Sequence, residues 1–174
     1  MRLIATSIVA MLPLVFVGCG NPPSAPTTSG AKTNLDGSKY LLAASPAGGK
    51  GVIDVRAKAK DNEEVVIVGR IGGSTNPWIK GKPAFSIVDS SLKACSDIEG
   101  DECKTPWDYC CVTDQLPKAT ALIKVVDASG KMMEGDAQEL LKLKELQTVT
   151  VQGKAKRDDA GNLTVMATGI FVNK

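Results

Sequence analysis

The chain has 174 residues with 21 Lys and Arg against 19 Asp and Glu, which gives a formal net charge of +2. This charge is too small to indicate a nucleic-acid or membrane partner by itself. The sequence has no histidine, which removes the commonest general base and the commonest metal ligand. The length is that of a single domain, and aromatic residues are only 4% of the chain, so the core must consist mainly of Val, Ile, Leu and Ala.

Residues 1–18 have the layout of a secretion signal, with Arg2, then an apolar run, then small residues. The apolar run of about 15 residues is short for a membrane span, which needs about 20. Its end, Phe16-Val-Gly-Cys19, resembles the lipobox of bacterial lipoproteins, although Phe16 stands where Leu is usual. The resemblance implies that Cys19 is diacylated and becomes the N-terminus, and Gly20 after it implies the outer membrane, facing the periplasm. The alternative is ordinary secretion with a free Cys19.

Residues 19–51 are rich in Pro, Ser, Thr, Gly and Ala. Such a segment cannot bury enough apolar surface to offset its chain entropy, so we expect a flexible tether between lipid and domain. Within it, residues 40–44 form either a short helical turn or a docking contact. The domain is expected over residues 52–174, beginning with an edge strand at residues 52–56.

The rest of the chain predicts a mainly β domain. Asp136 is the expected N-cap of one helix over residues 134–146, which carries four leucines among Glu and Lys. Runs rich in β-branched residues or alternating with period two predict five strands, at residues 63–73, 84–89, 119–127, 148–156 and 163–172.

Five strands with a helix between strands 3 and 4 match the plan of a five-stranded OB-like barrel. The segments Val66-Ile-Val-Gly-Arg-Ile71 and Ala84-Phe-Ser-Ile-Val-Asp89 resemble the opening of anticodon-binding-type OB domains, and Thr148-Val-Thr-Val-Gln-Gly153 resembles their later strand. A small β-sandwich or another open barrel is the alternative fold. The lipobox, the barrel pattern and Pro106-Trp-Asp-Tyr-Cys-Cys111 together resemble a group of uncharacterised bacterial lipoproteins, a resemblance that implies no activity.

An insertion over residues 90–118 holds four of the five cysteines, at Cys95, Cys103, Cys110 and Cys111. In an oxidising compartment an even set of cysteines usually forms disulfides, and each bridge would stabilise the insertion by roughly 2–4 kcal/mol. A bridge between the adjacent cysteines would be strained. The pairing is therefore either 95–110 with 103–111 or 95–111 with 103–110.

Other roles for this insertion are weaker. Four thiolates could hold Zn²⁺, but the spacing lacks the paired Cys-x2-Cys knuckles of zinc ribbons, and adjacent cysteines are awkward ligands for one ion. A redox pair is disfavoured because residues 95–111 carry five carboxylates and a single lysine, and negative charge raises thiol pKa values. The acidic run over residues 97–102 does not fit a Ca²⁺ loop of the EF-hand type and is read as solvated.

The sequence therefore predicts a membrane-anchored extracytoplasmic module that binds an envelope protein, peptide or glycan without catalysis or a cofactor. The expected binding surface is Trp107, Asp108 and Tyr109, because aromatic side chains on a stapled loop suit recognition. A single-stranded nucleic-acid-binding OB domain is the alternative, but residues 61–174 carry 14 basic against 17 acidic residues. The sequence has neither a histidine nor a Gly-x-Ser-x-Gly motif, so we do not expect an enzyme.

Overall fold

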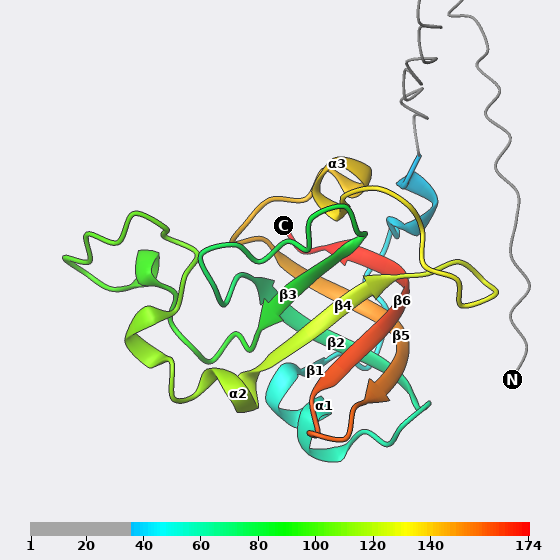
Figure 1. Cartoon of the computed structure of the whole chain (residues 1–174), viewed down its shortest axis with the longest axis horizontal. Helices are drawn as coiled ribbons and strands as arrows, with labels where there is room; N and C mark the ends of the chain where they lie inside the picture. Colours follow the sequence, from blue (N-terminus) through cyan, green and yellow to red (C-terminus); the bar gives the residue numbers. More distant parts are fainter. Residues whose placement is uncertain (1–35) are drawn as a thin grey trace, which may run out of the picture. The chain divides into compact units, whose positions relative to one another are not determined.

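The computed structural model describes residues 36–174, which lie in a compact unit spanning residues 34–174 (Figure 1). The predicted signal peptide, Cys19 and the rest of the predicted tether up to residue 35 lie outside the described residues. Within the described part, every helix is too short or too polar to cross a membrane.

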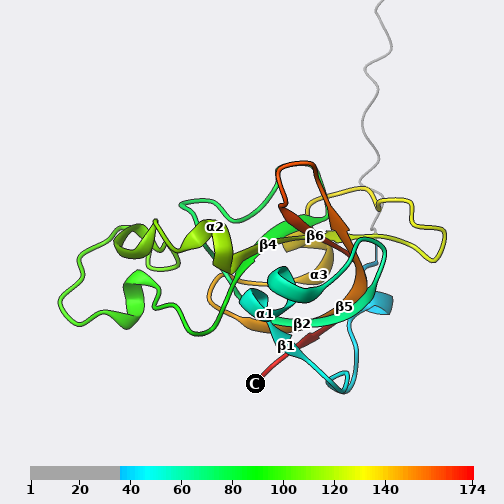
Figure 2. The same cartoon turned by 90° about the horizontal axis from the view of Figure 1, so that it is seen from below.

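Five strands close into a barrel, which confirms the mainly β class (Figures 1 and 2). They are β2 (Glu64–Ile71), β3 (Ala84–Val88), β4 (Thr120–Val125), β5 (Thr148–Arg157) and β6 (Leu163–Val172). Neighbours follow the order β2-β3-β4-β6-β5, and β5 pairs again with β2 to close the ring. Only β4 and β6 are parallel within it; the other pairs are antiparallel. This arrangement is consistent with an OB-like fold.

Period-two alternation places one face of each strand in the barrel interior. In β4, Ala121, Ile123 and Val125 are buried while the residues between them are half-buried. Phe85 supplies the one aromatic ring from these strands to the main core, so aliphatic side chains fill it as the composition requires. The core is completed by residues of all five strands and of the segments that cover the barrel ends, including Ile67, Ile87, Val149, Val151, Val165 and Ile170.

The predicted edge strand at residues 52–56 is wrong, because Val52–Lys58 forms helix α1. Val52 and Val55 are buried three residues apart, which is the helical period, and both contribute to the main core. A distant residue starts the helix: Asp89, at the end of β3, accepts the Ile53 N–H at 2.9 Å through Oδ2. A preceding two-residue strand, β1 (Lys50–Gly51), pairs in parallel with β2.

Asp89 is 8% exposed, and its other carboxylate oxygen accepts the backbone N–H and the hydroxyl of Ser91. Burial alone would raise the pKa of this carboxyl, but the hydrogen bonds from Ile53 and Ser91 outweigh it, and the pKa lies below its usual value. A group with a depressed pKa stabilises the fold above its unfolded pKa and loses that contribution as the pH falls through the folded pKa.

Replacing Asp89 with asparagine should therefore lower the free energy of unfolding at pH 7 by about 2 kcal/mol, because hydrogen bonds to a charged acceptor are lost. The difference from the wild type should shrink below pH 4, as the wild-type carboxyl also becomes protonated. Urea unfolding at pH 7 and pH 3 measures both effects. Asp127→Asn is the matched control, since Asp127 makes the same contacts with Ser129 on an exposed turn, and a smaller loss is expected. An equal loss at both pH values would contradict the ionic role of Asp89.

The helix between β4 and β5 is shorter than predicted. Helix α3 covers Ala137–Leu141, and the left-handed conformation of Lys142 (φ 52°) ends it. Leu143 is buried after the helix has ended, so the leucine spacing reflects packing of an irregular segment as well as a helical face. Asp136 stands at the N-cap position, but its carboxylate accepts the Gly81 N–H at 2.6 Å instead of capping α3.

Residues 38–42, which precede β1, contact the barrel. The 3₁₀ turn η1 (Ser38–Tyr40) ends in Tyr40, which is buried in the main core and donates its hydroxyl to Met133 Sδ at 3.0 Å. The Leu42 N–H donates to the Ile170 carbonyl of β6 at 2.8 Å. Of the two expectations for residues 40–44, the docking contact is confirmed, whereas the helical turn lies earlier, at Ser38–Tyr40, and includes only the first of these residues.

Candidate functional site

The insertion between β3 and β4 forms a lobe beside the barrel (Figure 1). It contains the 3₁₀ turns η2 (Cys95–Asp97) and η3 (Cys110–Val112) and the short helix α2 (Leu116–Ala119). The lobe has a small core of its own, separate from the barrel interior, formed by Val88, Leu92, Ala94, Tyr109 and Ala119. An ion pair between Arg70 of β2 and Asp97 connects the lobe to the barrel.

Three cysteines of the lobe meet. The Sγ atoms of Cys95, Cys103 and Cys110 all lie within 4.8 Å of one another. The Sγ atoms of Cys95 and Cys110 are 3.4 Å apart. A disulfide bond is about 2.05 Å long, so no described cysteine is bridged in this structure. The predicted disulfide framework stays a prediction.

Cys111 is oriented differently from its neighbour. Its Sγ lies 3.9 Å from that of Cys110 and 3.7 Å from Asp101 Oδ2. The two adjacent side chains therefore do not converge on the same partners: Cys110 joins Cys95 and Cys103, and Cys111 faces a carboxylate.

The clustered thiols differ in acidity. Burial, followed by the hydrogen bond with Cys110, raises the pKa of Cys95 to about 12. Cys103 is more exposed, and the hydroxyl and backbone of Thr105 hydrogen-bond to it and lower its pKa. Cys103 is therefore the thiol of the cluster that ionises more readily.

Of the three residues expected to bind a partner, Trp107 and Asp108 are partly exposed and Tyr109 is not. Tyr109 is fully buried, which is a correction: it is the largest side chain of the lobe's core and cannot contact a partner. Its ring packs close to Gly72, where a Cβ would lie 3.0 Å from Tyr109 Cε2. Trp107 and Asp108 are half-buried, and Trp107 Nε1 donates to the Thr75 carbonyl at 3.1 Å.

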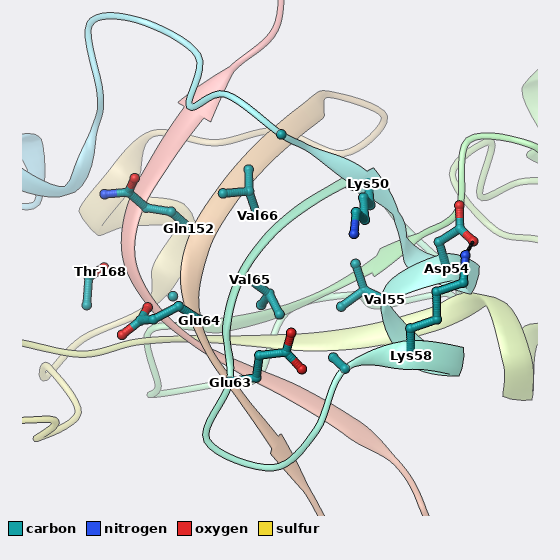
Figure 3. Close-up of a pocket in the computed structure, with 13 residues that line it drawn as sticks. Lys50, Asp54, Val55, Lys58, Glu63, Glu64, Val65, Val66, Gln152 and Thr168 are labelled. Atoms are coloured by element: carbon teal, nitrogen blue, oxygen red, sulfur yellow. Dashed lines mark hydrogen bonds and ion pairs between the residues drawn. The ribbon is translucent and has the colours of Figure 1, made fainter.

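A groove of about 480 Å³ lies between α1 and the beginning of β2 (Figure 3). Lys50, Asp54 and Lys58 stand along one side, with Glu64 and Gln152 on the other. Valines form much of the apolar surface between them. The lining residues are Gly48, Lys50, Asp54, Val55, Lys58, Ala59, Glu63, Glu64, Val65, Val66, Gln152, Gly153 and Thr168.

Charges of both signs line the groove. Lys58 Nζ pairs with Asp54 at 2.9 Å, and Glu64 pairs with Lys154 at 3.6 Å. These side chains are largely exposed, so each ion pair contributes little to stability and can exchange partners readily. The groove therefore offers both amino groups and carboxylates to a ligand.

Part of a strand edge also opens into the groove. β5 covers one edge of β2 from Glu64 to Arg70. On the other edge, β1 pairs only with Ile67 and Val68, and β3 only with Arg70 and Ile71. Within the described residues, Glu64–Val66 thus have no strand partner on the side that faces α1.

This groove is not evident in the sequence, because its lining comes from the segment before α1, from α1, β2 and β5, and from one residue of β6. The available signals were the high density of lysines over residues 50–60 and the pair Glu63-Glu64 just before a strand. Neither shows that the two stretches face each other across a valine surface.

The face formed by β3 and β4, which OB-folds commonly use for binding, is different in character. Its outward positions include Ser86, Leu122 and Lys124, all half-buried. The nearby ring of Trp78 packs on Phe85, with centroids 5.7 Å apart, and its Nε1 donates to Glu145 Oε1 at 2.5 Å. The described face thus offers a single lysine and no free aromatic platform.

No protein-family model matches this chain, and no curated protein matches it in sequence. Among solved structures, OBody AM1L10 bound to hen egg-white lysozyme is similar to it, with a TM-score of 0.41 and 14% sequence identity. The match covers 76% of this chain and 99% of the other. The barrel assignment rests on the strand order and register of this chain.

Proposed function

We propose that this chain is a lipid-anchored, non-catalytic binding module of the bacterial cell envelope. Its OB-like barrel binds an extended, charged peptide segment of an envelope protein. The observation that carries this proposal is the groove between α1 and β2, where an unpaired strand edge lies beside amino groups and carboxylates.

The strand edge supports a peptide as ligand. An extended peptide can add to an exposed edge through main-chain hydrogen bonds, while flanking pockets select its side chains. Glu64–Val66 provide such an edge over a short length. Because β1 pairs with β2 from Ile67 onward and α1 lines the groove opposite, the free edge is short and admits a short extended segment, not a whole sheet.

The charges support a peptide over an oligonucleotide. Lys50 and Lys58 would pair with acidic groups of the ligand, and Glu63 and Glu64 with basic ones. A single-stranded nucleic acid would instead need a basic groove with aromatic rings for stacking. The lining of this groove contains carboxylates as well as lysines, and it has no aromatic residue. A glycan would use the same hydrogen-bonding groups without needing the strand edge.

Membrane attachment is the second part of the proposal and rests on the lipobox-like Phe16-Val-Gly-Cys19. Two or three acyl chains give stable anchoring, whereas a single chain is marginal. Replacing Cys19 with alanine should move the protein from the membrane fraction to the soluble fraction of cells. Cys111→Ala is the control and should stay membrane-bound; a Cys19→Ala protein that remains in the membrane would contradict lipid anchoring.

The groove is tested with ten-residue peptides selected by display on residues 34–174, a unit with its own core. The double variant Lys50→Glu, Lys58→Glu should weaken binding of acidic selected peptides by at least about tenfold, or about 1.4 kcal/mol. Fluorescence anisotropy measures the affinity. Lys93→Glu, an exposed change on the cysteine lobe, is the control and should leave the affinity unchanged.

Two results would overturn the peptide assignment. The first is binding that is insensitive to the groove variants and lost in Trp107→Ala, which would move the site to the lobe. The second is an oligosaccharide that binds the groove when no selected peptide does.

A further inference from the structure

We propose that Cys95, Cys103 and Cys110 bind one thiophilic metal ion, Zn²⁺ or Cu⁺, through three thiolates. This site lies in the cysteine lobe, and it stands or falls independently of the peptide groove on the barrel.

The distances between the sulfur atoms fit a shared ion. A Zn–S bond of about 2.3 Å in tetrahedral geometry places two sulfurs about 3.8 Å apart. The Sγ atoms of Cys95 and Cys110 are 3.4 Å apart, and all three Sγ atoms lie within 4.8 Å of one another, so small shifts bring them to this spacing. One disulfide would use two of these sulfurs and would give no reason for the third to lie within the same radius. A single ion accounts for all three.

The backbone holds two of the ligands in position. The Cys95 N–H donates to the Asp108 carbonyl at 2.9 Å, and the Ser96 N–H donates to the Pro106 carbonyl at 3.0 Å. These bonds align the chain at the start of η2 with the chain that leads into η3, and so bring Cys95 and Cys110 together. Burial of Tyr109 between Asp108 and Cys110 anchors the second arm in the lobe's core.

The third ligand comes from the turn between these arms. Asp101 fixes that turn, because its Oδ1 accepts the Cys103 N–H at 2.6 Å. Cys103 is half-buried and Cys110 is exposed, whereas Cys95 is buried. The cluster is thus closed on the side of Cys95 and open toward solvent on the other, which gives an ion a path of entry.

Cys111 is excluded from the ligand set. Its Sγ lies 3.9 Å from that of Cys110 but does not share the 4.8 Å radius that joins Cys95, Cys103 and Cys110, so only one of the two adjacent cysteines has to bind the ion. Three thiolates leave one coordination position of a tetrahedral ion available to water or to another small ligand. Thiolate ligands select Zn²⁺ and Cu⁺ over Mg²⁺ or Ca²⁺, which prefer oxygen.

The experiment uses residues 34–174, reduced and handled without oxygen, with Zn²⁺ as the probe. Titration followed by metal analysis should give one ion per chain, and Co²⁺ should give the charge-transfer absorption of cobalt bound to thiolate. Cys95→Ser, Cys103→Ser and Cys110→Ser should each weaken Zn²⁺ binding by more than tenfold. Cys111→Ser is the matched control and should bind as the wild type does.

A second readout does not depend on the spectrum. Zn²⁺ should raise the melting temperature of the wild type and of Cys111→Ser, because a ligand that binds the folded state stabilises it. The rise should be absent in Cys103→Ser, whose fold is verified by its amide NMR spectrum in the absence of metal.

Three outcomes would overturn the proposal. The first is that protein isolated from the envelope without reductant has no thiol that can be alkylated and weighs about 4 Da less than the reduced chain. That result would show that the four lobe cysteines form two disulfides. Cys103→Ser could bind Zn²⁺ as tightly as the wild type, which leaves no three-thiolate site. Cys111→Ser could lose binding as fully as Cys110→Ser, which contradicts this ligand set.

Discussion

Replacing Tyr109 with alanine is expected to reduce the free energy of unfolding by about 3–5 kcal/mol, the usual loss when a buried aromatic side chain is truncated. Tyr109 is fully buried and is the one aromatic residue in the core of the cysteine lobe. The small neighbours Ala94 and Ala119 cannot expand to fill the space, so the cavity would persist or the lobe would open. Urea unfolding of residues 34–174 measures the loss.

The adjacent aromatic residue supplies the control. Trp107 is half-buried and contacts Thr75 through a single hydrogen bond, so Trp107→Ala should cost far less than Tyr109→Ala. Hydrogen exchange locates the damage: the amides of Cys95 and Ser96, which bond across the lobe, should lose protection in Tyr109→Ala. Equal stability of the two alanine variants would show that the lobe does not depend on a tyrosine core.

The hydroxyl of Tyr109 adds a finer distinction. Its oxygen is buried without a hydrogen-bond partner among the described residues, and burial raises its pKa. An unsatisfied buried hydroxyl is unfavourable, so Tyr109→Phe keeps the packing and removes the cost. The phenylalanine variant should therefore be at least as stable as the wild type. Comparing Tyr109→Phe with Tyr109→Ala therefore distinguishes the contribution of the ring, which we expect to stabilise the lobe, from that of the hydroxyl.

The strands were predictable from the sequence because alternation is a local property. The stretch from Glu64 to Ile71 and the one from Leu163 to Val172 show period two and bury one face, as expected. Helix α1 was not predictable in this way, since Val52 to Arg56 contains β-branched residues that favour a strand. Its helical state depends on Asp89, a cap located 36 residues further along the chain, and on a core that accepts residues at the helical period.

The candidate sites depended even more on tertiary contacts. The sequence singled out the four lobe cysteines, but only the fold shows that Cys95, Cys103 and Cys110 form the cluster and that Cys111, though beside Cys110, is not part of it. It placed Tyr109 on the surface because aromatic residues on loops often bind partners, whereas the lobe needed this ring for its own core. The groove joins residues 48–66 to residues of β5 and β6, and no local pattern brings these together.

Replacing Gly153 with alanine is expected to destabilise the barrel by about 3 kcal/mol, the upper end of the usual cost of overpacking. Gly153 lies at a register shift between β5 and β6, where the bulge bends β5 around the barrel. A Cβ at this position would lie 2.2 Å from the Met166 carbonyl oxygen and 2.9 Å from the Ala167 Cα. These are backbone atoms of a paired strand, so no side-chain rotation relieves the clash.

The glycine of Thr148-Val-Thr-Val-Gln-Gly153 is therefore required by strand pairing, and the effect of Gly153→Ala should be global. Urea unfolding should show a lower midpoint for the whole cooperative transition, with hydrogen exchange accelerated along both β5 and β6. Gly161→Asn is the control, because its position is open to solvent at a φ of 78°, a conformation that asparagine tolerates. If Gly153→Ala proved as stable as Gly161→Asn, β5 would have to pair with β6 without the close backbone approach at this position.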